Sequence, residues 1–185
     1  MQNIGEEIVG QYLKMVCGCD FVEYNLTNPD IQGEIDVFGI NIKERKVYIC
    51  EVAIHLVTGL QYVKNNQPQN AVKLINKFSK DIEYVKKYFP DFQHTVMLWS
   101  PIVKDQKGTH NQLRDIQEIL SKIKEKYQIE IVLKINQDFW KALTDLRKSA
   151  KEISAESKSP VIRFLQIEEQ LKHHIELMQR RTDKN

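Results

Sequence analysis

The sequence predicts an α/β fold in which a central mixed β-sheet is flanked by helices and followed by a C-terminal helical appendage. Two observations predict this class. Short segments rich in β-branched and aromatic residues, typical of strands, alternate with longer segments whose apolar residues recur every three or four positions, typical of helices. The composition agrees, because 185 residues that are 42% hydrophobic and 28% charged fit one globular domain with its own core.

The first part of the chain predicts one helix and an antiparallel meander. Residues 4–17 carry apolar residues at helical spacing, and Gly18 is typical of a helix C-terminus. A strand follows at 21–26. The segments 34–40 and 46–54 also have strand character, and the short polar link between them indicates a hairpin.

The second part predicts helices and strands in alternation. Amphipathic helices fit residues 71–88 and 111–126, and buried strands fit residues 94–100 and 129–135. A strand–helix–strand order is typical of crossover connections, so these strands are expected to join the meander in one mixed sheet.

Two further helices, at 137–153 and 160–180, complete the chain. The sequence is therefore divided into a core domain, residues 1–135, and a helical extension, residues 136–185. The apolar stripe of the last helix predicts that this extension packs on the core or on a partner chain.

Charge is distributed unevenly, although the net charge is only +2. Residues 1–63 hold four Lys or Arg against nine Asp or Glu, whereas residues 64–185 hold a surplus of bases, which is compatible with a nucleic-acid partner. No apolar run reaches the roughly 18 residues of a membrane span. The N-terminus has no signal-peptide character, and the three cysteines indicate reduced thiols, so the sequence predicts a cytoplasmic protein with no membrane partner.

Two carboxylates in the predicted hairpin are the chemically informative residues. Asp36 and Glu51 lie in otherwise apolar strands, where an unpaired carboxylate is costly. Facing carboxylates on adjacent strands repel each other unless a cation lies between them, and Mg²⁺ is commonly bound by one or two carboxylates. The structural alternative is that Asp36 is exposed and Glu51 is paired with a lysine.

The pattern GEIDV, a short hairpin and a strand ending in EV resembles the PD-(D/E)xK nuclease superfamily, and GEEIVGQYL at the N-terminus resembles the first helix of its resolvase-like members. The resemblance covers roughly residues 4–100 and implies a restriction-endonuclease-like sandwich. It also implies that Asp36 and Glu51 bind Mg²⁺, which Mn²⁺ can replace, together with the backbone carbonyl of Val52. Glu6 becomes an accessory acid from the first helix. Glu7 is the fallback, since the helical spacing does not decide between the two.

The sequence departs from the family pattern at one important position. The family has a lysine two residues after the second carboxylate, and this chain has Ala53 there. Three explanations are open. His55 shares a strand face with Glu51 and could act as a general base or orient water. Lys73 or Lys77 could reach the site from the following helix. Alternatively, the enzyme is inactive and only binds.

Basic residues of the segment 64–87 could contact the phosphates of DNA. The candidates for nucleic-acid binding are Lys64, Lys73 and Lys77. The alternative is an ordinary solvated helix face.

The sequence thus predicts a Mg²⁺-dependent endonuclease that cuts double-stranded DNA to 5′-phosphate and 3′-hydroxyl ends, the polarity being implied by the resemblance. Its small size is similar to that of the catalytic subunit of heterodimeric restriction endonucleases, so the predicted partner is a larger DNA-recognising subunit, or a second copy in a homodimer. The alternatives are a Holliday-junction resolvase or repair nuclease, and a catalytically inactive DNA-binding or scaffold protein.

Overall fold

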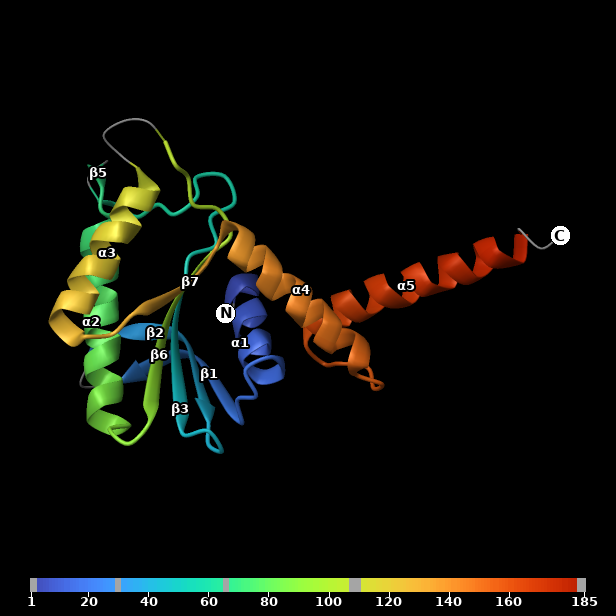
Figure 1. Ribbon diagram of the computed structural model, residues 1–185, viewed down its shortest axis with the longest axis horizontal. Helices are drawn as coiled ribbons and strands as arrows, with labels where there is room; N and C mark the ends of the chain where they lie inside the picture. Colours follow the sequence, from blue (N-terminus) through green and yellow to red (C-terminus); the bar gives the residue numbers. More distant parts are fainter. Residues whose placement is uncertain (1–2, 29–30, 65–66, 107–110, 183–185) are drawn as a thin grey trace.

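The structure is a computed structural model of the 185-residue chain, and it describes residues 3–28, 31–64, 67–106 and 111–182. Within these residues the main sheet has five strands in the order β1-β2-β3-β6-β7 (Figure 1). The strands are β1 (Phe21–Asn28), β2 (Ile31–Asn41), β3 (Lys46–Val52), β6 (Gln93–Ser100) and β7 (Ile131–Ile135).

The sheet is mixed, as the sequence predicts. The pairs β1–β2 and β2–β3 are antiparallel and form the meander. The pairs β3–β6 and β6–β7 are parallel, and a helix connects the two strands of each pair. The coarse prediction of an α/β fold with a mixed sheet flanked by helices is therefore confirmed.

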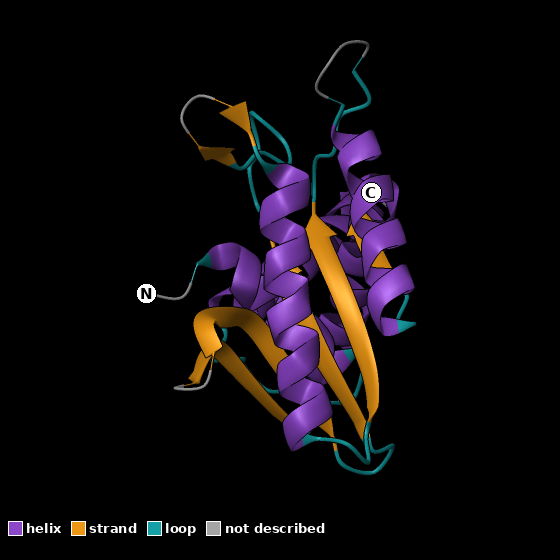
Figure 2. Cartoon of the chain, turned by 90° about the vertical axis from the view of Figure 1, so that its left-hand side faces the viewer, coloured by secondary structure: helices purple, strands orange, loops and turns teal. Residues whose placement is uncertain are grey.

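Helices cover both faces of the sheet, and β3 shows why, because its side chains alternate. Val47 and Ile49 face the core beneath α2 (Asn70–Tyr88) and α3 (Gln112–Tyr127), the face toward the viewer in Figure 2. Tyr48, Cys50 and Val52 face a second core. That core lies beneath α1 (Ile4–Met15) and α4 (Asn136–Glu152).

The C-terminal helices differ in how they pack. Helix α4 contributes Phe139 and Ala142 to the core that it shares with α1 and the sheet. Helix α5 (Pro160–Thr182) is buried only near its start, at Val161, Ile162 and Leu165, and then extends away from the body of the molecule (Figure 1). None of the described helices is long and apolar enough to cross a membrane.

Two details depart from the sequence predictions. A small hairpin of β4 (Val63–Lys64) and β5 (Gln67–Pro68) lies in a polar stretch for which no strand was predicted. In addition, β3 ends at Val52 rather than continuing through residue 54, because the chain turns at His55, whose carbonyl accepts a hydrogen bond from the Gly59 N–H at 3.1 Å.

Candidate functional site

Asp36 and Glu51 lie side by side where β2 and β3 separate. The antiparallel register pairs Val37 with Cys50, so Asp36 and Glu51 follow one residue beyond the last paired position. Both side chains are buried, with 7% of Asp36 and 1% of Glu51 exposed. The structural alternative is therefore wrong for Asp36, which is not exposed, whereas its second part, a lysine paired with Glu51, is confirmed.

Lys77 brings a positive charge to both carboxylates. It lies on α2 between Leu74 and Asp81, which are both buried and lie one turn before and after it, so its side chain leaves the helix toward the sheet. Its Nζ lies 3.2 Å from Asp36 Oδ1 and 2.5 Å from Glu51 Oε1. Of the two lysines that could reach the site from this helix, the structure places Lys77 there.

The two carboxylates differ in their further hydrogen bonds. Asp36 Oδ2 accepts a hydrogen bond from the Val52 N–H at 2.8 Å, which orients this carboxylate across the end of β3. The Tyr62 hydroxyl donates to Glu51 Oε1 at 2.9 Å. Glu51 Oε2 is buried and accepts no hydrogen bond from the described residues. A buried carboxylate oxygen without a donor is costly unless a cation or water satisfies it.

The environment makes Glu51 unusually easy to protonate. Burial raises its pKa to about 7, the charge of Asp36 adds to this rise, and Lys77 and Tyr62 oppose it. Burial by itself would lower the pKa of the Lys77 ammonium. Glu51 and Asp36 outweigh that effect and raise the pKa, so Lys77 stays charged.

Asp81 is a third buried carboxyl near this cluster. It lies one helical turn after Lys77 on α2. Burial raises its pKa to about 8, and the charges of Glu51 and Asp36 contribute, against Lys77. The site therefore concentrates more negative potential than Lys77 alone neutralises, which favours an additional cation or bound protons.

His55 and Lys73 lie around Tyr62 rather than on the carboxylates. His55 is exposed beyond the end of β3, and its ring stands perpendicular to that of Tyr62 with 6.2 Å between centroids. The prediction that His55 shares a strand face with Glu51 is wrong, because the strand ends three residues earlier. The Lys73 ammonium lies 5.5 Å from the centroid of the Tyr62 ring.

The first helix buries Glu6 rather than Glu7. Glu6 is the N3 residue of a capping box, in which it bonds Asn3, and it also accepts from Asn25 Nδ2 at 3.2 Å. Within the described residues Glu6 is not hydrogen-bonded to either strand carboxylate. Glu7 accepts from the Ser159 hydroxyl at 2.6 Å, which joins α1 to the start of α5.

The predicted phosphate-binding lysines have different surroundings. Lys64 lies in β4, and its side chain is outside the described part of the structure. Lys73 is exposed on α2, whereas Lys77 is half-buried and paired. Of these three, Lys73 is therefore the one shown at the surface.

The donor set fits a hard cation of the Mg²⁺ type. Asp36, Glu51 and the Val52 carbonyl would supply the oxygens, and Glu51 Oε2 is the oxygen that lacks a partner. No three His, Cys, Asp or Glu side chains gather into a metal site in the described ranges. An ion here would thus need water or substrate oxygens as further ligands, which Mg²⁺ usually keeps.

Comparison of the chain with models of protein families, with curated proteins and with solved structures finds no match. The fold and the site define an α/β protein in which two central strands end in buried carboxylates, and a lysine from α2 contacts both of them. Tyr62 and Asp81 belong to this site, although the sequence does not predict that either lies beside the two carboxylates. Asp81 could have been found from the sequence, because it is an acid among the apolar residues of α2. Tyr62 lies in a loop, where no periodic spacing of residues indicates its contact with Glu51.

Proposed function

We propose that the chain is a Mg²⁺-dependent DNA endonuclease with a restriction-endonuclease-like fold, acting as a restriction endonuclease or as its small cleavage subunit. The proposal rests mainly on the buried pair Asp36 and Glu51, in which Glu51 Oε2 has no hydrogen-bond donor among the described residues. The order α1-β1-β2-β3-α2-β6 of the helices and main-sheet strands, interrupted only by the small β4–β5 hairpin, supports the proposal, because it is the order that the resembled nucleases use.

In this proposal Asp36 and Glu51 hold the ion. Bound Mg²⁺ would polarise the scissile phosphate and lower the pKa of a bound water. The Val52 N–H holds Asp36 Oδ2, and Tyr62 holds Glu51 Oε1, so both carboxylates are oriented before an ion arrives.

Lys77 takes the role of the lysine that is missing at position 53. Its Nζ is already within 3.2 Å of both carboxylates, and its raised pKa keeps it charged, so it can donate to a phosphate oxygen or orient the attacking water. His55 is 6.2 Å from Tyr62 between ring centroids, and we assign it a contact with substrate rather than with the ion.

A non-catalytic protein is the second candidate, and one observation favours it. Lys77 by itself neutralises much of the charge of Asp36 and Glu51, so the three residues could form a structural ion-pair network. Such a protein would bind DNA without cutting it, and substitution of the acids would leave DNA binding unchanged.

The test is nicking of supercoiled plasmid with Mg²⁺ or Mn²⁺, using Asp36→Asn and Glu51→Gln. Each should reduce nicking about 100-fold or more, since even the loss of a group that only orients a metal ligand costs about 10- to 100-fold. Glu34→Gln is the matched control, because Glu34 is an exposed acid on the same strand as Asp36. Nicking by the wild type that both site variants retain in full contradicts the proposal.

A substrate comparison separates the two kinds of nuclease. A restriction-type enzyme should cut linear duplex at least as well as a synthetic four-way junction. Strong preference for the junction would instead indicate a resolvase with the same ion-binding pair.

A further inference from the structure

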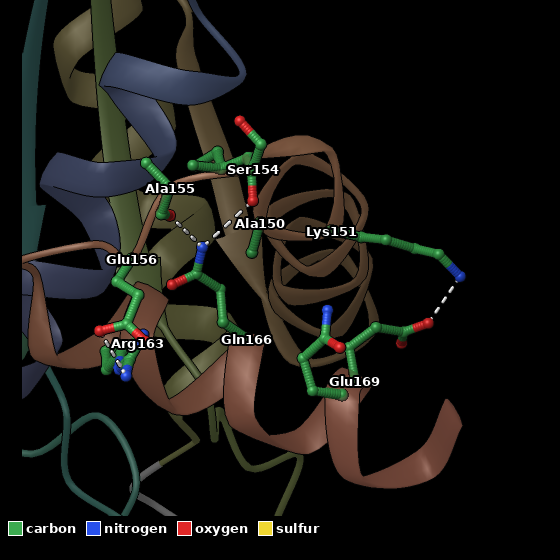
Figure 3. A pocket seen from close by; sticks show the side chains of 10 residues that line it. Ala150, Lys151, Ser154, Ala155, Glu156, Arg163, Gln166 and Glu169 are labelled. Carbon is green, nitrogen blue, oxygen red and sulfur yellow. Dashed lines mark hydrogen bonds and ion pairs between the residues drawn. The ribbon is translucent and has the colours of Figure 1, made fainter. Parts of the chain in front are cut away.

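The first turns of α5 are fixed to the body of the molecule by bonds on one side of the helix. Gln166 donates to the Ala155 carbonyl at 2.9 Å, Arg163 pairs with Glu156 at 2.9 Å, and Glu169 pairs with Lys151 on α4 at 2.6 Å (Figure 3). These contacts set the direction in which the rest of α5 leaves the domain. The helix beyond residue 169 therefore extends from a fixed base.

A row of apolar side chains runs along a different side of the same helix. Its members are between 45% and 65% exposed, and we call them the α5 stripe: Phe164, Ile167, Leu171, Ile175 and Met178. Their spacing of three or four residues averages 3.5, which is the period of helices that pair lengthwise. Large contiguous apolar surface of this kind marks an interaction site in soluble proteins.

The spacing of the α5 stripe is the same in both directions from Leu171. Ile167 and Ile175 lie four residues away on either side, and Phe164 and Met178 lie seven residues away. A two-fold axis near Leu171 would therefore place apolar residues of one helix against apolar residues of an identical helix that runs in the opposite direction. Such self-complementarity is what a two-fold interface requires.

Charges beside the stripe favour the same antiparallel arrangement. Glu168 and Lys172 lie on one flank of the stripe, before and after Leu171. Glu168 already pairs with Arg147 of α4 in its own chain at 3.1 Å, so an antiparallel copy would bring its Lys172 toward this existing pair as a second cation. Arg180 and Arg181 end the helix. Antiparallel pairing puts these arginines at opposite ends of the interface, whereas parallel pairing would place them together.

We propose that the α5 stripe is a homodimer interface, in which α5 helices of two copies of this chain pack antiparallel about Leu171. The contact involves one helix per chain and is smaller than a standard interface of about 800 Å² per partner, so a dissociation constant in the micromolar range is expected. This inference does not depend on the nuclease proposal, because it concerns a surface that the Asp36–Glu51 site does not use.

Sedimentation equilibrium of the full chain tests the inference. The mean mass should rise from 21.8 kDa toward twice that value between about 1 and about 100 µM protein. Leu171→Glu should weaken association at least about tenfold, since it places two like charges at the two-fold axis. A mass that stays at 21.8 kDa over the whole range overturns the inference.

His173→Glu is the matched control, because it adds an acid on the same turn but about 200° around the helix from Leu171. It should leave association within about twofold of the wild type. Both side chains are exposed, so both variants should keep the wild-type circular dichroism. A dimer that neither substitution weakens uses another surface, and that result also overturns the inference.

Crosslinking tests the direction of the helices. Ile167→Cys and Ile175→Cys chains, mixed, should be joined by a short bis-maleimide, whereas neither variant alone should crosslink above the wild-type level. Efficient crosslinking of each variant to itself would show parallel helices and contradict the antiparallel arrangement.

Discussion

The end of the central strands and the far half of α5 depart from the usual distribution of residues in opposite ways. At the strand ends, Asp36 and Glu51 bury carboxylates beside the apolar core beneath α2. On α5, Leu171 and Ile175 expose apolar side chains among charged ones. Each arrangement costs free energy in the isolated chain, because water solvates charges well and apolar surface badly.

The difference between the two regions lies in what would relieve the cost. The carboxylates are partly satisfied within the chain, by Lys77, Tyr62 and the Val52 N–H, and one oxygen is left over. This unpaired oxygen, Glu51 Oε2, could be satisfied by a small cation. The α5 stripe has the spacing to match a second helix, so it fits a macromolecule. The unpaired Glu51 Oε2 and the exposed α5 stripe therefore indicate two different kinds of ligand for one chain, an ion and a protein.

The largest expected effect comes from removing the charge between the two carboxylates. Lys77→Ala should lower plasmid nicking by about 10²–10³-fold, the usual loss when one donor to a developing negative charge is removed. Lys86→Ala is the control, because Lys86 lies on the same helix and contacts Tyr127 rather than either carboxylate within the described contacts. If the two variants lose the same small amount of activity, Lys77 has only a structural role.

The next effect concerns stability and its pH dependence. The pKa of Glu51 is raised to about 7 in the folded chain from an ordinary 4.5, so the folded state binds the proton more tightly than the unfolded state. Stability is therefore lost as pH rises from about 4.5 to about 7. Glu51→Gln removes this loss and should raise the free energy of unfolding at pH 8 by up to about 3 kcal/mol.

Urea unfolding of the wild type and Glu51→Gln at pH 5 and pH 8 measures this effect. The advantage of the variant should be clearly larger at pH 8. An equal difference at both pH values would mean that Glu51 does not titrate in this range.

A smaller effect is expected at Tyr62. Tyr62→Phe removes the hydroxyl that donates to Glu51 Oε1, which should cost about 1 kcal/mol of stability and raise the pKa of Glu51 further. Carboxyl carbon-13 NMR shifts follow the pKa directly. Tyr84→Phe is the control, since Tyr84 packs among aromatic rings on the same face of α2 as the core. A Glu51 pKa that both variants leave unchanged would contradict the role of Tyr62.

The smallest effect should come from the α5 stripe in the monomer. Ile175→Ser should change the free energy of unfolding by less than about 0.5 kcal/mol at low protein concentration, because the side chain is exposed. Leu146→Ala, in the buried contact between α4 and α5, should cost about 2–5 kcal/mol in the same measurement. A large loss in Ile175→Ser would show that the stripe already packs within its own chain.

Periodicity in the sequence predicts the strands and singles out Asp36 and Glu51 in apolar strands, because alternation along a strand is local information. The mixed character of the sheet follows instead from the order of strands and helices. Periodicity did not choose between Lys73 and Lys77, since both lie on one helix and the choice depends on how α2 crosses the sheet. The apolar neighbours of His55 predict that it continues the strand, but the turn closed by the Gly59 N–H ends that strand earlier. Tyr62 was missed because loop geometry brings it to Glu51, and no spacing in the sequence encodes that contact.

Binding of Mn²⁺ to the purified chain, followed by electron paramagnetic resonance, tests the central claim most directly, because it requires neither a DNA sequence nor a partner. The wild type and Glu34→Gln should each bind one ion at the Asp36–Glu51 pair, and Asp36→Asn and Glu51→Gln should lose it. If the wild type binds no ion, or if the two site variants bind it as tightly as the wild type does, then Lys77 is the cation that this pair is built to hold and the nuclease proposal is wrong.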